Sequence, residues 1–349
     1  MTDETPTNGW HIFKGNVDKP HNEIDDKLPP PPRWRDFKGD LKNAHEPPPL
    51  DGNDPEAYRG RKYQAGQEEV EMVNAAIYLR RPLLVTGPAG AGKSSLAYAV
   101  AWELSLGPVL HWPITTRSTI QDGLYSYDAI GRLQESQMSK PLAGDDQAAC
   151  KAPDVGRFIR LGPLGTALLP TKRPRVLLID EIDKSDIDLP NDLLNVFEEG
   201  RFPIHELVRM GEDQTTSVYP FKGNTPDVTV IGGEVICSAF PLVVLTSNGE
   251  RELPKPFLRR CIRLDIPEPN EDKLADIVRS HFGADLETGE REALIQAFLT
   301  RRTPGSLATD QLLNAAYLTL AGINLRHVRD DGTSLLDAVL RRLDDSVRP

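Results

Sequence analysis

The sequence contains little cysteine and no long apolar run. Its three cysteines, Cys150, Cys237 and Cys261, are far apart, odd in number and outside any C-x-x-C pair. This pattern argues against a disulfide framework and predicts a protein of the reducing cytoplasm. The polar, acidic start, MTDETPTNGW, does not resemble a secretory signal. No apolar run approaches the roughly 18 residues of a membrane span, so membrane insertion is not expected.

The chain also lacks an excess of positive charge. It has 41 Lys and Arg against 52 Asp and Glu, which gives a formal net charge of −11. Nucleic acids and anionic membranes need clustered Lys and Arg, so neither is expected as the main partner. The seven histidines are scattered, and no Ser-His-Asp or Cys-His arrangement follows from the spacing. Neither a metal-ligand cluster nor a nucleophilic triad is therefore predicted.

What the sequence does contain is a glycine-rich motif, GPAGAGKS, at Gly87–Ser94. It matches G-x-x-x-x-G-K-[ST] in full and lies between a predicted strand at 82–86 and a predicted helix at 94–106. Glycines allow backbone N–H groups to close around phosphate oxygens, and the helix presents its positive end to them. Lys93 is expected to reach the β- and γ-phosphates, and Ser94 to supply a hydroxyl to Mg²⁺. A glycine-rich turn without a ligand is the alternative.

A buried strand with an acidic end is predicted at 175–180, where the sequence is RVLLID. Asp180 is expected to hold Mg²⁺ directly or through water, and Glu181 to orient and deprotonate the attacking water. An acidic strand end exposed to solvent is the alternative. The acidic run that follows, which includes Asp183, lacks the spacing of a calcium loop and is interpreted as a solvated face with a helix cap. The residues expected to bind the nucleotide are then Gly87, Pro88, Ala89, Gly90, Ala91, Gly92, Lys93, Ser94, Ser95 and Asp180.

Two further groups of polar residues follow the acidic strand. A buried strand at 240–246 leads to Thr246-Ser247-Asn248, and a polar residue at this strand end is expected to fix a water beside the γ-phosphate; a plain turn is the alternative. Arg259 and Arg260 stand at the end of the α/β part. An arginine stabilises a transferring phosphate only if it reaches the nucleotide, so a pair far from its own loop would serve a neighbouring subunit. The alternative is a surface pair bound to Glu or Asp. The guanine-reading N-K-x-D motif is absent, which favours ATP over GTP.

Strands alternate with helices as far as residue 266, which predicts an α/β fold with a parallel sheet. The α/β domain is predicted at 59–267, with insertions near 117–174 and 205–238. Four helical patterns at 268–349 predict a small helical domain. Residues 1–58 form a Pro-rich lead that is expected to be largely disordered. The aromatic residues of this lead are interpreted as a cover for the edge of the main domain, with a docking peptide as the alternative.

The order of these motifs resembles that of the AAA+ ATPases, and within them the MoxR-like group of the helix-2-insert clade. The resemblance covers about residues 60–345 and is carried by GPAGAGKS, VLLIDEID and VVLTSNGERELPKPFLRRC. It implies a three-layer αβα P-loop NTPase core with a parallel sheet, followed by a small all-helical AAA+ lid. The roles that it implies are Walker A for Lys93 and Ser94, Walker B for Asp180 and Glu181, sensor 1 for Asn248, and the arginine finger for Arg260, with Arg259 as second choice.

Members of this family are typically hexameric rings that act as remodelling chaperones, often with a von Willebrand factor A domain partner. The resemblance therefore implies a Mg²⁺-dependent ATPase that forms a homo-oligomeric ring and remodels or activates a protein. A nucleic-acid-directed motor, a restriction- or defence-system subunit and a slow ATP-gated switch are the alternatives. Many relatives carry a sensor-2 arginine where this chain has Gly305 or Leu307. Either Arg301 or Arg302 substitutes for it, or the lid senses the nucleotide weakly.

Overall fold

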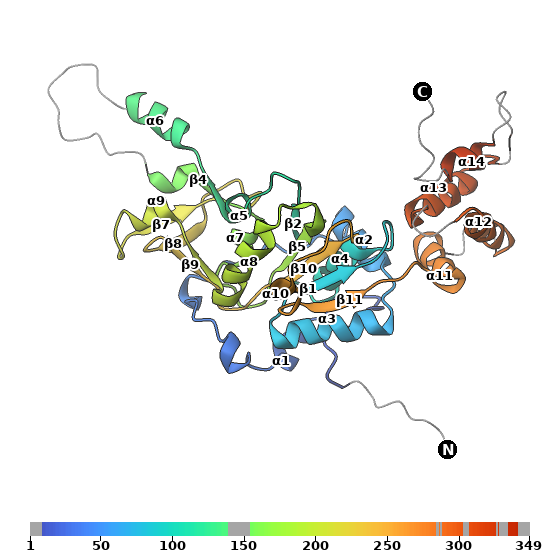
Figure 1. Cartoon of the computed structure of the whole chain (residues 1–349), viewed down its shortest axis with the longest axis horizontal. Helices are drawn as coiled ribbons and strands as arrows, with labels where there is room; N and C mark the ends of the chain where they lie inside the picture. The colour runs from blue at the N-terminus through green and yellow to red at the C-terminus, as the bar shows by residue number, and fades with distance from the viewer. Residues whose placement is uncertain are drawn as a thin grey trace.

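The computed structural model describes residues 9–138, 154–283, 286, 288–302, 307–325, 327 and 334–340. At its centre is a five-stranded parallel sheet in the order β11-β1-β10-β5-β2 (Figure 1). These strands are β1 (Leu83–Thr86), β2 (Leu110–Pro113), β5 (Val176–Asp180), β10 (Leu242–Ser247) and β11 (Ile262–Asp265). The predicted α/β fold with a parallel sheet is confirmed.

Helices cover both faces of this sheet. Side chains alternate between the two faces of a strand, so Leu177 and Ile179 of β5 enter one hydrophobic core while Val176 and Leu178 enter the other. A parallel sheet buried on both sides needs such continuous apolar strands. The helices α3 and α4 pack into one core, and α7 and α8 into the other. Their bounds are α3 (Gln67–Leu79), α4 (Lys93–Glu103), α7 (Pro163–Ala167) and α8 (Asp188–Glu199).

The first predicted insertion contains two short helices that pack together and a part that leaves the core. The short helix α5 (Ile120–Leu124) packs against α7, and between them the chain leaves the core to form β3 (Tyr125–Tyr127), α6 (Ala129–Met138) and β4 (Ile159–Leu161). β3 and β4 pair antiparallel. Figure 1 shows α6 projecting from the core at the end opposite the C-terminal helices. The middle of this insertion, 139–153, lies outside the described residues.

The second predicted insertion is an antiparallel sheet in the order β6-β9-β8-β7. Its strands are β6 (Arg201–Pro203), β7 (Thr215–Val218), β8 (Val228–Ile231) and β9 (Glu234–Ile236), with α9 (His205–Val208) between the first two. It follows α8, which ends at Gly200 with a φ of 62° that favours glycine. The chain then returns through β10 and the short α10 (Lys255–Leu258) to the edge strand β11.

The prediction that residues 1–58 are largely disordered is wrong for residues 9–58. This segment runs along the core, with Ile12 and Phe13 fully buried (blue in Figure 1). The physical reason is that buried Asn74 binds the backbone of the segment, accepting the N–H groups of Ile12 and Phe13 at 2.7 and 3.0 Å. Its helical pieces are α1 (Ile24–Lys27), α2 (Pro55–Lys62) and two 3₁₀ turns, Arg33–Arg35 and Leu41–Asn43.

The aromatic residues of the lead divide between core and surface. Phe13 is buried, and Phe37 stacks on Phe240 with ring centroids 5.2 Å apart. Trp34 is 76% exposed and Trp10 is 42% exposed. The interpretation of these residues as a cover for the domain edge therefore holds for the two phenylalanines and not for Trp34.

The C-terminal helices form a third hydrophobic core of their own. They are α11 (Glu271–Phe282), α12 (Thr288–Arg301), α13 (Thr309–Leu320) and α14 (Leu335–Val339). Figure 1 shows them at one end of the molecule, beyond β11. The fourth predicted helix, 334–346, extends past the described residues. Within the parts of the chain that the structure describes, no helix is both long and apolar enough to cross a membrane.

Candidate functional site

The glycine-rich loop follows β1 and has a backbone that side chains would obstruct. Gly87, Gly90 and Gly92 have φ values of 143°, 73° and 92°. A Cβ on Gly87 would lie 2.2 Å from the carbonyl oxygen of Ile266, and one on Gly90 would lie 2.4 Å from the Cβ of Ala308. Glycine is therefore required at both positions, because the loop passes against the residue after β11 and the start of α13.

Lys93 is the first residue of α4 and is buried, with 7% of its surface exposed. Its ammonium donates to the carbonyl oxygens of Gly87 and Pro88, at 2.8 and 2.7 Å, and to Oδ1 of Asn248 at 2.7 Å. Burial lowers the pKa of Lys93, and nearby carboxylates, Asp183 first among them, oppose that shift. The structure thus brings together Lys93 and Asn248, two of the predicted site residues, because β1 and β10 are parallel neighbours.

Asp180, at the end of β5, is the point where three side chains converge. Ser94 Oγ donates to its Oδ1 at 2.7 Å, Thr246 Oγ1 donates to the same oxygen at 2.6 Å, and His111 Nε2 lies 3.3 Å from Oδ2. Burial favours the neutral acid, but these hydrogen bonds outweigh burial and lower the pKa of Asp180 to about 2. The carboxylate is therefore ionised at neutral pH. Ser94 and Asp180 present the hard oxygen donors that Mg²⁺ prefers.

Glu181 follows Asp180 in a left-handed conformation, with a φ of 61°. Its backbone N–H donates to Thr246 Oγ1 at 2.9 Å, which holds the turn against β10. Its carboxylate accepts a hydrogen bond from Lys184 Nζ at 2.8 Å, and this bond raises the pKa of Lys184. The Glu181 side chain is 41% exposed, so water reaches the carboxylate that is predicted to activate it.

Asp183 is not the solvated residue that the sequence suggested, because it is only 2% exposed. Its Oδ2 accepts the backbone N–H groups of Asn248 and Glu250, each at 3.0 Å. The aspartate therefore fixes the loop that carries Asn248. Sequence reasoning also missed His111, a polar residue in an otherwise apolar strand, which is the signal that points to it. It singled out the strand end Thr246-Ser247-Asn248 but did not predict the hydrogen bond from Thr246 to Asp180.

These groups line one large cavity of about 740 Å³. The loop from Ala89 to Ser95 lines it, as do Asp180, Glu181 and Asn248. The part of the wall beyond the loop comes from the linker between α2 and α3 and from the C-terminal helices. Its members include Tyr63, Gln64, Ile277, His281 and Leu313, none of which was predicted.

A family profile described as the AAA domain (dynein-related subfamily) matches residues 82–261. This is more than half of the chain. The chain belongs to this family of AAA domains. No curated protein sequence matches it. Among solved structures, NtrX from Brucella abortus in complex with ADP matches at 16% identity and a TM-score of 0.34, over 83% of this chain and 54% of that one. The chain thus spans about half the length of NtrX.

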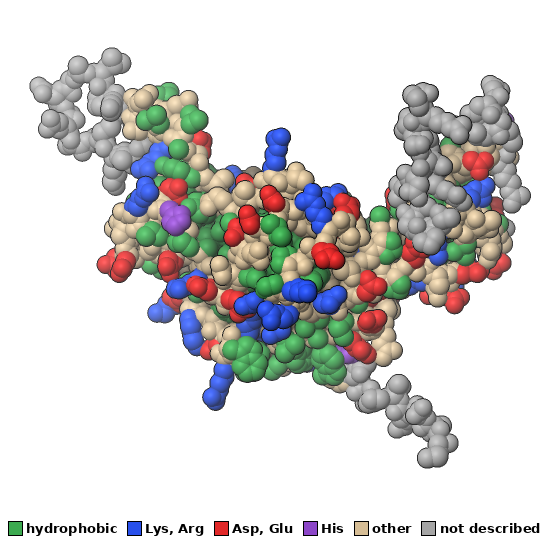
Figure 2. All heavy atoms as spheres, viewed as in Figure 1, with side chains coloured by type: hydrophobic (Ala, Val, Ile, Leu, Met, Phe, Trp, Pro, Cys, Tyr) green, Lys and Arg blue, Asp and Glu red, His purple; other side chains and the backbone are tan. Residues whose placement is uncertain are grey.

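Arg259 and Arg260 of the AAA domain lie outside this cavity. β11 runs parallel to β1, and Ile262 is opposite Leu83, so the arginine pair lies beside the start of β1 while the glycine-rich loop follows its end. Arg260 Nε donates to Glu198 Oε1 at 2.7 Å, as the surface-pair interpretation expected. Figure 2 shows basic side chains gathered over α10 and β11, the elements on either side of the pair. Neither arginine lines the cavity.

The two candidate substitutes for a sensor-2 arginine also lie outside the cavity lining. Arg301 binds Asp337 at 2.8 Å, and Arg302 binds the carbonyl oxygen of Pro269 at 2.8 Å. The start of α13 instead contributes Thr309 and Asp310 to the lining. Gly305 lies outside the described residues. Neither Arg301 nor Arg302 is therefore placed beside the cavity as a substitute for that arginine would be.

Proposed function

We propose that this AAA domain protein binds ATP with Mg²⁺ and hydrolyses it to ADP and phosphate. The observation that carries the proposal is the convergence of the Ser94 and Thr246 hydroxyls on Asp180, beside the ammonium of Lys93 and the amide of Asn248. Three segments remote in sequence supply these groups, and they meet in a cavity of about 740 Å³, large enough for a nucleotide.

The residues divide the work by their chemistry. Lys93 holds loop carbonyls in this structure and would exchange them for the β- and γ-phosphate oxygens. Ser94 and Asp180 would hold Mg²⁺, which when bound neutralises charge on the phosphate oxygens. Asn248 would orient the attacking water, and Glu181 would take its proton after separating from Lys184.

The proposal includes a homo-oligomeric ring, taken to be hexameric as in relatives. Its support is the position of Arg260 at the opposite end of the parallel strands from its own loop. An arginine so placed acts on phosphate only in a neighbouring subunit. Glu198 holds Arg260 in the isolated chain and would release it when the neighbour's nucleotide arrives.

We further propose that the ring is MoxR-like and remodels a protein partner in the cytoplasm, with a protein of the von Willebrand factor A class as the candidate. The insertion between α5 and α7 supports this, because α6 exposes large apolar side chains that a protein surface can cover. Ile130, Leu133 and Met138 are 71%, 60% and 86% exposed. Cys237 and Cys261 are buried free thiols, which fits a reducing compartment.

Replacement of Glu181 by Gln tests the ATPase proposal directly. Glu181→Gln is expected to bind ATP as the wild type does and to lose at least about 100-fold in turnover, because the amide cannot accept the proton of water. Phosphate release and binding of a fluorescent ATP analogue measure the two effects. Glu212→Gln, in an exposed turn, is the matched control and is expected to keep full activity. Equal turnover in the wild type and Glu181→Gln would contradict the proposed mechanism.

A further inference from the structure

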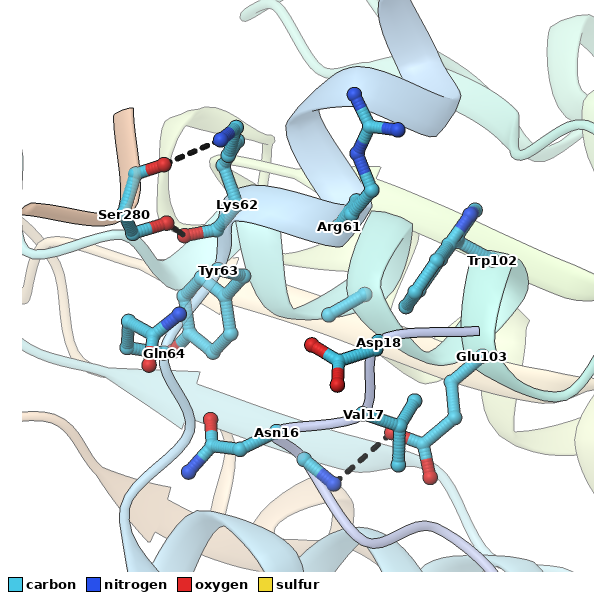
Figure 3. A pocket seen from close by; sticks show the side chains of 13 residues that line it. Asn16, Val17, Asp18, Arg61, Lys62, Tyr63, Gln64, Trp102, Glu103 and Ser280 are labelled. Atoms are coloured by element: carbon cyan, nitrogen blue, oxygen red, sulfur yellow. Dashed lines mark hydrogen bonds between the residues drawn. The ribbon is translucent and has the colours of Figure 1, made fainter. Parts of the chain in front are cut away.

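Part of the wall of the nucleotide cavity is a short segment that precedes residues 82–261, which the family profile matches. The nucleotide cavity is lined by Lys62, the last residue of α2, and by residues 63–64 of the linker between α2 and α3. The same residues line a second cavity, of about 330 Å³, whose other walls include Asn16, Val17 and Asp18 (Figure 3). A segment with a cavity on each side has fewer packing contacts to fix it than a core strand has. Its position therefore depends strongly on its hydrogen bonds.

One set of these bonds joins the linker to α11. Ser280 Oγ donates to the carbonyl oxygen of Lys62 at 2.8 Å, and Lys62 Nζ donates to the carbonyl oxygen of Ser280 (Figure 3). Lys273 Nζ donates to the carbonyl oxygen of Gln64. Ile277 and His281 of α11 line the same cavity. Since the glycine-rich loop takes the phosphates, the nucleoside is left to the rest of the lining, which the linker and α11 share with residues 266–270 and α13.

Tyr63 Oη of the linker also donates to Glu69 Oε2 of α3 at 2.8 Å, and a further set of bonds comes from the N-terminal segment. Asn16 Nδ2 donates to the carbonyl oxygen of Ala65 at 3.2 Å, and the backbone N–H of Ala65 donates to Asn16 Oδ1 at 3.0 Å. One amide side chain thus satisfies both backbone groups of a single linker residue. The contact is close: a Cβ on Gly15 would lie 2.5 Å from the Cβ of Ala65.

The segment that carries Asn16 is itself firmly held. Glu103 of α4 is 2% exposed, and its carboxylate accepts the backbone N–H groups of Lys14 and Gly15, at 2.5 and 2.9 Å. Asn74 of α3, fully buried, binds the backbone of Phe13 as donor and acceptor. Buried polar side chains are costly unless they are bonded, so these two tie the segment to the core. Asn16 is therefore presented to the linker from a fixed base.

We infer that Asn16 is a positioning residue for ATP. By fixing Ala65 it holds Tyr63 and Gln64 where they can enclose the nucleoside, while Lys93 and Asp180 hold the phosphate end independently. The inference rests on the proposed function. It predicts that loss of Asn16 weakens the binding of ATP but not of a phosphate chain that has no nucleoside.

Calorimetric titration with ATP and with inorganic tripolyphosphate, each with Mg²⁺, separates these two ends. For Asn16→Ala the Kd of ATP is expected to rise about tenfold, whereas that of tripolyphosphate stays within about twofold of wild type. The KM for ATP rises with it, and kcat is unchanged. Asn22→Ala is the matched control, because Asn22 lies exposed in the same segment and accepts a hydrogen bond from Arg173 at 3.1 Å instead of binding the linker. It is expected to leave both affinities unchanged.

Two results would overturn the inference: Asn16→Ala binding ATP as tightly as Asn22→Ala, or Asn16→Ala losing affinity for both ligands equally. Asn16→Asp keeps the acceptor for the Ala65 N–H and is expected to fall between Asn16→Ala and wild type. If Asn16→Ala does not fold, the ATP and tripolyphosphate affinities of Asn16→Asp test the inference instead. A wild-type chain that binds tripolyphosphate but not ATP would refute the proposed function itself, which the variants alone cannot do.

Discussion

The sequence predicted which residues belong to the site better than it predicted which side chains each of them contacts. The motifs identify Lys93, Ser94, Asp180 and Asn248, and the structure places them together because β1, β10 and β5 are adjacent and parallel. His111 and Thr246 contact Asp180 only because of that strand order. The sequence carries no local signal for such neighbours beyond a polar residue in an apolar strand. The buried state of Asp183 was missed for the same reason.

The contacts of Asp180 predict a pH-dependent contribution to stability. Its pKa is lowered from 3.8 to about 2 in the folded chain, so folding favours the ionised form. The stabilisation is fully present above pH about 4 and is lost as the pH falls toward about 2. Its size is about 2 kcal/mol, since one pKa unit corresponds to about 1.4 kcal/mol.

Denaturant unfolding of wild type and Asp180→Asn, without nucleotide or Mg²⁺, measures this contribution. The difference in unfolding free energy is expected to shrink between pH about 4 and about 2. Asp213→Asn, in an exposed turn, serves as the control. A difference that stays constant over this range would show that the Asp180 hydrogen bonds do not act through ionisation.

Elements with a strong apolar period were predictable, and short polar ones were not. The predicted strand at 175–180 corresponds to β5, and the predicted helix at 94–106 to α4. The edge strand β11 was missed because it has only four residues, too few for the alternation of apolar and charged residues in IRLD to stand out. The helix α2 was missed because only Ala57 and Gly60 of its eight residues are buried.

Packing between elements predicts the effect of a methyl group at Gly123. This residue of α5 lies against Trp112 of β2, and a Cβ there would come within 2.4 Å of the indole ring. Because the indole is 5% exposed and cannot move freely, Gly123→Ala is expected to destabilise the fold by about 1–3 kcal/mol.

Thermal unfolding of Gly123→Ala and of a control variant measures this effect. Gly289→Ala is the matched variant, because Gly289 lies in α12 with open space around its Cα. Alanine there is expected to be neutral or to raise the stability by up to about 1 kcal/mol. If Gly123→Ala unfolds at the wild-type temperature, the α5–β2 contact is looser than the structure shows.

At the scale of the whole molecule, the arrangement of the arginine pair predicts complementation between subunits. Arg260→Ala is expected to keep ATP binding and to lose about 1,000-fold in turnover. The reason is that the nucleotide bound by the neighbouring subunit then lacks the guanidinium that stabilises the transferring phosphate. Mixing Arg260→Ala with Glu181→Gln is expected to restore part of the activity, since each subunit supplies what the other lacks. Phosphate release measured against subunit ratio tests this expectation.

Arg259→Ala is the companion variant, because Arg259 is exposed one position earlier. If the large loss follows Arg259 instead, the second of the two candidates carries the role. Normal hydrolysis by a dilute, monomeric Arg260→Ala protein would contradict action between subunits.

The sequence by itself determined the phosphate-binding loop, the acidic strand end, the α/β class and the helical C-terminal part. Those features follow from local residue type and period, which are written along the chain. Only the tertiary structure decided which strands are neighbours and which end of the sheet Arg260 occupies. It also decided that residues 9–58 are packed, because their order depends on Asn74 and Glu103, side chains from α3 and α4 that bind the segment's backbone. Contacts between distant parts of a chain produce no periodic pattern in its amino-acid sequence.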